Sequence, residues 1–136
     1  MILLDTCAII WMIDDQPMSG RSQAAIREAA LYAGVLVSPV SAWEVGLLAT
    51  RVHRPLTFRP SPAAWFAILL SRPGVALTPL DPGPAIEAAF LPGDLPRDPA
   101  DRLLVATARH LGVPLVTRDQ RILAYAAQGH VAAIAC

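Results

Sequence analysis

The sequence predicts an α/β protein with a central, mostly parallel sheet of about five strands flanked by helices. Short apolar segments alternate with longer segments of helical periodicity, which is typical of this class. Asp5 and Asp119 end two of the predicted strand segments, and Pro99 and Gly112 mark the start and end of a strongly helical segment. No internal repeat, linker or low-complexity segment divides the chain, so we expect one domain over residues 1–136.

The expected elements follow from apolar patterning and from capping signals. Buried strands are predicted in the apolar segments 1–5, 35–38, 74–80, 113–119 and 130–136. Helices are predicted at 19–34, 41–51, 62–72, 83–92, 99–112 and 120–129. Three prolines make residues 52–62 a loop. A chain in which strands and helices alternate in this way favours parallel pairing with helices on both faces of the sheet.

Composition excludes several classes of protein. The chain is 54% hydrophobic and only 16% charged, which is unlike a disordered segment. Its apolar runs are well short of the ~20 residues of a membrane-spanning helix, and MILLDTCAII lacks the basic start of a signal peptide. Cys7 and Cys136 form no metal-binding pattern, so we expect free thiols in a reducing cytoplasm, with Cys7 turned towards the core. A net charge of zero argues against bulk nucleic-acid binding.

Acidic residues converge on one edge of the predicted sheet. Asp5 and Asp119 end strands, and Glu44 lies on the helix after another strand. Asp98 and Asp101 begin the helix before the strand that ends at Asp119. Because open parallel sheets form their active crevice at the carboxyl ends of the strands, we expect these carboxylates to share one site.

Each acid also has a structural interpretation. Asp5, Asp98 and Asp119 could cap the helices that follow them, and Glu44 fits a capping box with Ser41. Clustered carboxylates, however, repel one another unless a cation neutralises them. A ligand set made only of oxygen atoms favours Mg²⁺ or Mn²⁺. Such an ion lowers the pKa of bound water and assists the hydrolysis of phosphodiesters.

Three segments resemble PIN-domain ribonucleases, in particular the VapC-like toxins of type II toxin–antitoxin systems. They are MILLDTCAI at residues 1–9, SPVSAWEVGLL at 38–48 and RDPADRLLVATARHLGVPLVTRD at 97–119. The motifs keep the family's order and spacing, and the resemblance spans essentially the whole chain. It implies a PIN-like three-layer fold and a Mg²⁺- or Mn²⁺-dependent endoribonuclease.

The resemblance also implies which acids form the site. The four positions of the family, which serve as metal ligands and catalytic residues, fall on Asp5, Glu44, Asp101 and Asp119. The family places its third acid directly before an apolar helix, which selects Asp101 over Asp98. Because Asp98 precedes a proline and is expected to cap the helix, we assign it a supporting role beside the metal site.

Further expectations concern the surroundings of the site and the partners of the protein. Thr6 and Thr117 match hydroxyl positions that support the metal site in the family, and Arg102 and Arg118 are candidates for contacts with RNA phosphates. The resemblance implies an RNA substrate, a cognate antitoxin, a homodimer, and contact with DNA only through the antitoxin. The apolar segments 9–13 and 62–70 are candidates for the surface that the antitoxin covers.

Two other functions remain open at this point. The alternative from another class is a PIN-like fold that binds proteins or regulates without nuclease activity, although the presence of all four acids weighs against it. A related alternative is a PIN nuclease that acts on DNA or structured RNA outside any toxin system. A response-regulator receiver is excluded because the chain has no lysine, and a dinucleotide-binding fold because no glycine follows the first strand.

Overall fold

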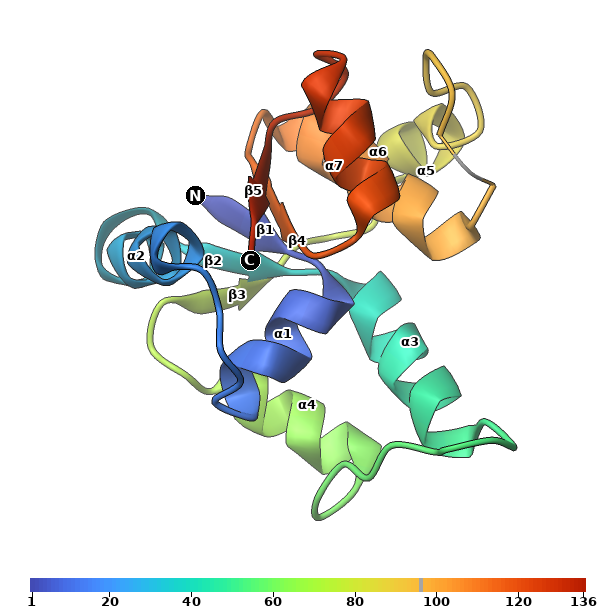
Figure 1. Cartoon of the computed structure of the whole chain (residues 1–136). Coiled ribbons are helices and arrows are strands. Elements are labelled where there is room, and N and C mark those ends of the chain that lie inside the picture. The colour runs from blue at the N-terminus through green and yellow to red at the C-terminus, as the bar shows by residue number, and fades with distance from the viewer. Residues whose placement is uncertain (96) are drawn as a thin grey trace.

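The computed structural model describes residues 1–95 and 97–136 (Figure 1). The strands are β1 (Ile2–Leu4), β2 (Val35–Val37), β3 (Val75–Leu77), β4 (Leu115–Thr117) and β5 (Ala133–Ala135). The helices are α1 (Thr6–Ile13), α2 (Gly20–Glu28), the π-helical turn η1 (Ala29–Ala33), α3 (Pro39–Thr50), α4 (Pro62–Leu70), α5 (Pro82–Glu87), α6 (Pro99–Leu111) and α7 (Gln120–Ala127). The strands form one sheet in the order β3-β2-β1-β4-β5, and every pairing is parallel. The predicted α/β class is confirmed.

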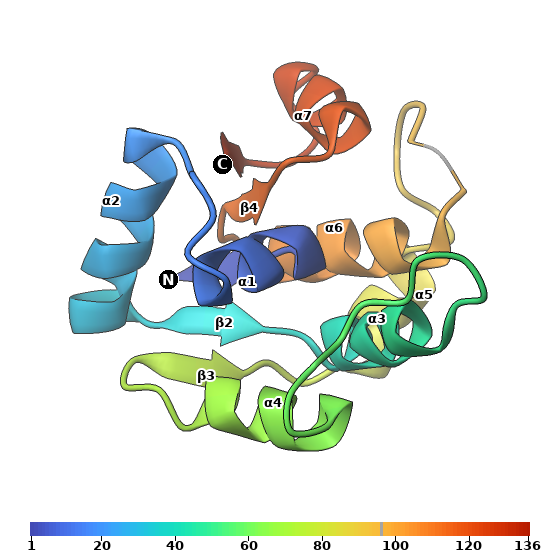
Figure 2. The same ribbon diagram turned by 60° about the horizontal axis from the view of Figure 1, so that its bottom comes forward.

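Helices cover both faces of the sheet. Ile2 and Leu4 of β1 point into one apolar core, whereas Leu3 points into the other, because successive side chains of a strand alternate between faces. The first core lies beneath α1, α2, η1 and α4, and α3 contributes Val45 to it. The second core lies beneath α5, α6 and α7. These two groups of helices give the molecule three layers (Figures 1 and 2), and burial of both faces explains why the strands are apolar without alternation.

The central strand is β1, with β2 on one side and β4 on the other. Leu3 pairs with Leu36 of β2 and with Leu115 of β4. β2 and β3 are added on one side of β1, and β4 and β5 on the other, so the strand order changes sides at β1 although all strands run in the same direction. In open α/β sheets, ligands bind at the carboxyl ends of the strands beside such a change of side. The edge formed by the ends of β1 and β4 is therefore the place to look for a site.

The helix that carries Glu44 begins earlier than the sequence suggested. α3 starts at Pro39, and the hydroxyl of its N-cap Ser38 accepts a hydrogen bond from the amide of Val40 at 3.1 Å. The expected capping box of Ser41 and Glu44 is therefore wrong, because both residues lie inside the helix. The Ser38–Pro39 pair is the stronger start signal, since proline suits the first helical position. Its consequence is that the Glu44 carboxylate is not used as a cap.

Other local differences are smaller. The helix expected at 19–34 is α2 followed by η1, and the helix expected at 83–92 is the shorter α5. Cys7 is exposed and not in the core, because the helix begins at Thr6 and the alternation of β1 no longer applies there. Cys136 is also a free thiol. Within the described part of the chain, no helix combines the length and apolar character needed to cross a membrane.

We predict that Gly74→Ala lowers the free energy of unfolding by about 2–4 kcal/mol, measured by urea denaturation. Gly74 has a φ of 78°, and a Cβ atom there would lie 2.2 Å from the carbonyl oxygen of Ala30. Gly112→Ala is the matched control, because Gly112 has a φ of 64° but no heavy atom within 4 Å of an added Cβ. It should cost only about 1 kcal/mol; equal losses would show that close packing at Gly74 is unimportant.

Candidate active site

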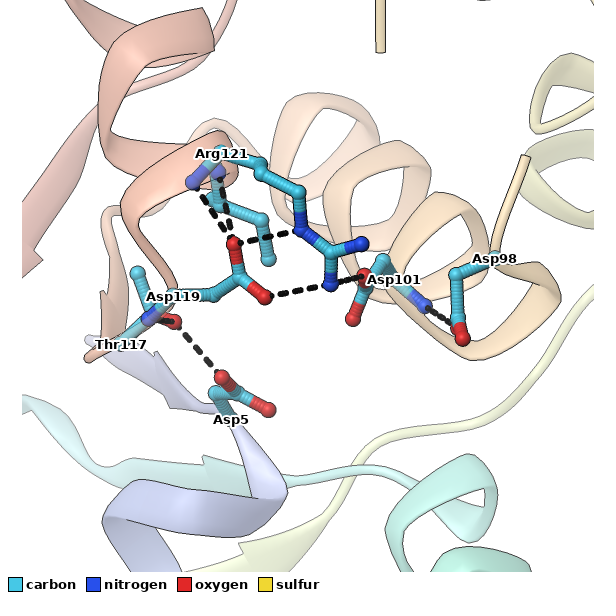
Figure 3. Close-up of polar contacts among 7 residues, drawn as sticks. Asp5, Asp98, Asp101, Thr117, Asp119 and Arg121 are labelled. Atoms are coloured by element: carbon cyan, nitrogen blue, oxygen red, sulfur yellow. Dashed lines mark hydrogen bonds and ion pairs between the residues drawn. The ribbon is translucent and has the colours of Figure 1, made fainter. Parts of the chain in front are cut away.

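Three aspartates point towards one another at the edge of the sheet formed by the ends of β1 and β4 (Figure 3). Asp5 directly follows β1, and Asp119 lies two residues after β4. Asp101 is in the first turn of α6, which packs on the neighbouring face. The structure thus brings together acids that are far apart in the sequence, at the place that the strand order indicates.

Thr117 links two of these aspartates. Its hydroxyl donates to Oδ2 of Asp5 at 2.6 Å, and its oxygen accepts from the backbone amide of Asp119 at 3.0 Å. Asp5 is only 5% exposed, and although it is the N-cap residue of α1 its side chain makes no capping hydrogen bond. Burial raises the pKa of the Asp5 carboxyl, and the hydrogen bond from Thr117 opposes that shift. Asp5 is therefore a buried acid whose position is fixed by a hydroxyl.

A second hydroxyl positions Glu44. The Thr6 hydroxyl donates to Oε2 of Glu44 at 2.5 Å, and its oxygen lies 2.9 Å from the buried hydroxyl of Ser41. Partial burial raises the pKa of Glu44, the hydrogen bond from Thr6 opposes the shift, and the charges of Asp5 and Asp98 add to it. Glu44 is thus held within electrostatic range of the aspartates.

Asp98 and Asp101 have different roles at the start of α6. Oδ1 of Asp98 accepts a hydrogen bond from the amide of Asp101 at 3.1 Å, which confirms Asp98 as the helix cap. The Asp101 side chain is 15% exposed and is free of capping duty. Burial, followed by the charges of Asp98, Asp119 and Asp5, raises the pKa of Asp101 to about 7, although Arg121 opposes the shift. Asp101 therefore lies in a markedly negative environment.

Arg121 is the residue of this cluster that sequence reasoning missed. Its Nη2 atom lies 2.7 Å from Oδ2 of Asp119 and 3.3 Å from Oδ2 of Asp101, so one guanidinium bridges two acids (Figure 3). Asp119 also caps α7, since its Oδ1 accepts from the amides of Arg121 at 2.7 Å and Ile122 at 3.3 Å. The hydrogen bond from the Arg121 side chain is the main reason that the pKa of Asp119 is lowered. The available signal was an arginine two residues after a capping acid.

The two arginines singled out by sequence lie in different settings. Arg102 donates to the backbone carbonyls of Ala88 at 2.7 Å and Leu95 at 3.0 Å, so its guanidinium joins α6 to the preceding connection. The expectation that Arg102 contacts phosphate is not supported, because these donors point into the protein. Arg118 is exposed, and its Cζ atom lies 3.2 Å from the centroid of the Trp11 ring.

The chemistry of this cluster fits a hard divalent cation. Its four acids offer only oxygen donors, and three of them have raised pKa values because burial and mutual repulsion disfavour their charged forms. Across residues 1–95 and 97–136, no three Asp, Glu, His or Cys side chains stand close enough to share one ion. The Arg121 guanidinium stands between two of the acids and partly compensates their charge. The residues that would hold an ion are Asp5, Glu44, Asp101 and Asp119.

Comparison with known proteins identifies the family. The family model described as "PIN domain" matches residues 2–128. The chain belongs to the PIN domain family. It is also 34% identical over 122 residues to ribonuclease VapC22 of Mycobacterium tuberculosis (strain ATCC 25618 / H37Rv), a match that covers 89% of this chain and 88% of that protein.

Solved structures share the fold of this PIN domain. The VapBC2 structure from Rickettsia felis, bound to a DNA fragment from its promoter, has a TM-score of 0.70 at 14% identity and covers 99% of this chain and 98% of its own. The FitAcB structure from Neisseria gonorrhoeae has a TM-score of 0.60 at 20% identity, covering 98% of this chain and 96% of its own. At these identities the likeness shows the fold alone.

The raised pKa of Asp101 predicts how the stability of this PIN domain depends on pH. Between the unfolded value of ~3.9 and the folded value of about 7, the folded state keeps a proton that the unfolded state loses. Asp101 therefore makes the metal-free protein less stable as pH rises through this window. Asp101→Asn should raise the melting temperature by several degrees more at pH 8 than at pH 5.

The surface variant Asp15→Asn is the control for this measurement. Asp15 lies on the surface just beyond α1, with a φ of 49° that asparagine also tolerates. It should follow the wild type at both pH values. Calorimetry measures the melting temperatures. If Asp101→Asn raised the melting temperature equally at pH 5 and pH 8, the pKa of Asp101 would not be raised in the folded protein.

Proposed function

We propose that residues 1–136 form a single PIN domain that acts as a Mg²⁺- or Mn²⁺-dependent endoribonuclease, the toxin of a type II toxin–antitoxin pair. The observation that carries the proposal is the convergence of Asp5, Asp101 and Asp119, with Glu44 alongside, at the ends of β1 and β4. The relative that shares 34% of its residues is named a ribonuclease, which supports RNA as the substrate.

The catalytic role of each acid follows from its surroundings. In this proposal Asp5 and Asp101 would hold the ion most directly, and Glu44 and Asp119 would complete the set. When bound, the ion supplies an activated water and stabilises negative charge on the phosphodiester. Thr117 keeps the Asp5 carboxylate in place, and Thr6 does the same for Glu44. Asp98 supports the site by fixing the first turn of α6, and with it the position of Asp101.

Arg118 is the proposed contact for the RNA backbone. It lies between Thr117 and Asp119, immediately beside the acids, and is exposed. The indole of Trp11 holds its guanidinium in place through a cation–π contact. A guanidinium can donate two parallel hydrogen bonds to phosphate. An arginine that is already held in place loses less conformational entropy on forming them than a freely rotating one. Arg102 is left out of this role because its donors bind carbonyl groups.

The proposed partner is an antitoxin protein, and we further propose a homodimer that works in the cytoplasm, with DNA contacted only through the antitoxin. The solved VapBC2 and toxin–antitoxin complexes that share this fold support an antitoxin partner. A cavity of about 310 Å³ between α1 and α2, lined by Trp11, Met12, Met18 and Ile26, lies beside segment 9–13. Ile68 of α4 is 53% exposed, within segment 62–70. Both apolar segments thus offer surface that a partner could cover.

We predict metal-dependent cleavage of RNA by the purified, partner-free protein. Incubation of total cellular RNA with Mg²⁺ or Mn²⁺ should give discrete fragments, and EDTA should prevent them. Asp5→Asn should reduce the cleavage rate by roughly 100-fold or more, since even residues that only support metal ligands contribute 10–100-fold. Circular dichroism of the variant confirms that it is folded.

The same assay separates the alternatives. Folded protein that cleaves neither RNA nor DNA would favour a PIN-fold binding or regulatory module without nuclease activity. Cleavage of DNA in preference to RNA would overturn the ribonuclease assignment while leaving the metal-dependent site intact.

A second prediction tests the division of roles at the start of α6. Asp101→Asn should abolish cleavage while the protein stays folded, because it removes a metal-binding carboxylate. Asp98→Asn should keep most of the activity, since asparagine caps helices about as well as aspartate. Comparable activity loss in the two variants, measured on one fluorescent RNA substrate, would contradict the assignment of the metal ligand to Asp101.

A further inference from the structure

The guanidinium of Arg121 lies between two carboxylates of the cluster, those of Asp119 and Asp101. Its Nη2 atom contacts Oδ2 of Asp119 at 2.7 Å and Oδ2 of Asp101 at 3.3 Å, and its Nε lies 3.2 Å from Oδ1 of Asp119. It thereby joins α7 to the first turn of α6 through two of the proposed metal ligands (Figure 3). A third carboxylate, that of Asp5, lies across the same space and has no contact with this arginine among the described polar interactions.

The Arg121 side chain can leave this position without disturbing the core. It is 55% exposed, and its hydrogen bonds to Asp119 and Asp101 are its only side-chain contacts of this kind within the described residues. The cap of α7 does not depend on the side chain, because it is the backbone amide of Arg121 that donates to Oδ1 of Asp119. Exposed ion pairs contribute little to stability, so the contacts are readily exchanged for others.

One guanidinium cannot balance all of the charge at this edge of the sheet. Its contacts reach only Asp119 and Asp101, and the described ion pairs place no cation beside the carboxylates of Asp5 and Glu44. A divalent ion carries twice the charge and binds carboxylate oxygens at shorter range than a guanidinium does. A divalent ion is therefore expected to interact with these carboxylates more strongly than the guanidinium of Arg121 does.

We propose that Arg121 is the internal counter-ion of the metal-free site, and that metal binding requires its guanidinium to leave the space between Asp101 and Asp119. The inference rests on the proposed function, since it takes the acids to be the metal ligands. While the arginine is in place, no three acidic side chains among the described residues lie close enough to share one ion. A guanidinium that occupies the space between two of the acids explains this spacing. The metal-free protein gains a partly neutralised cluster, and its affinity for the metal ion is correspondingly lower.

The test is a calorimetric titration of the full-length protein with Mn²⁺, without RNA, at one fixed pH. Arg121→Ala should bind Mn²⁺ roughly threefold to tenfold more tightly than the wild type, because no cation has to be displaced. Its metal-free form should melt at a lower temperature, and Mn²⁺ should raise that temperature by more than it does for the wild type. Arg121→Lys keeps the charge but loses the paired hydrogen bonds that Nε and Nη2 make to Asp119, so its affinity for Mn²⁺ should lie between those of the wild type and Arg121→Ala.

Arg72→Ala is the matched control. Arg72 is an exposed arginine that precedes β3 by three residues, so it lies at the opposite edge of the sheet from the acids. Its removal changes the net charge of the protein by the same amount and should leave the Mn²⁺ affinity unchanged. An equal gain in Arg72→Ala and Arg121→Ala would show a general charge effect and overturn the proposal.

The remaining outcomes separate this inference from the proposed function. If wild type and Arg121→Ala bind Mn²⁺ with equal affinity, or Arg121→Ala binds it more weakly, the arginine supports the ligands and the counter-ion role is wrong, while the metal site stands. If no variant binds Mn²⁺, both the metal site and the counter-ion role fail.

Discussion

Burial of carboxylates beside one another at the ends of β1 and β4 is the main electrostatic constraint on this structure. Asp5 is almost fully buried, and Asp101 is largely so. Charges placed this close together in a region of low dielectric cost free energy, and the cost must be offset by groups that stabilise the charged form. Thr117, Thr6 and Arg121 are those groups, and each comes from an element that the packing of the three layers holds rigidly. The parallel sheet thus serves mainly to hold repelling groups in register.

Much of the fold could be predicted because its signals are local. Pro99 and Gly112 bound α6 as expected, and Asp98 caps it, because capping depends only on neighbouring residues. The expected helix start at Ser41 was wrong for the same reason: a capping-box pattern of Ser41 and Glu44 competes with the stronger start signal at Ser38–Pro39. For Arg121 the sequence offers only its position two residues after a capping acid; its contact with Asp101 depends on how close the fold brings Asp101 to Asp119.

Thr117 and Thr6 each position one carboxylate through a hydroxyl group, but they depend on different parts of the fold. Thr117 is the last residue of β4 and donates to Asp5, which directly follows the neighbouring strand β1, so its geometry depends on the pairing of β1 with β4. Thr6 opens α1 and reaches Glu44 on α3, so its geometry depends on how these helices pack. Strand register places one carboxylate, and helix packing places the other. A change in strand register or in helix packing would therefore move one of the carboxylates even though the residues of the motif stayed the same.

Arg102 couples the site to a part of the molecule that carries no acid of the cluster. Its guanidinium holds the carbonyl groups of Ala88 and Leu95, at the two ends of a stretch of connection between α5 and α6. Because Arg102 directly follows Asp101, that stretch and the acid belong to one cooperative unit. Ala88, Leu91 and Leu95 of this stretch are buried in the core beneath α5, α6 and α7, so apolar packing and the hydrogen bonds from Arg102 fix the same segment. Loss of the Arg102 guanidinium would therefore leave two carbonyl groups without this donor and loosen the first turn of α6, on which Asp101 lies, although no acid of the cluster had been changed.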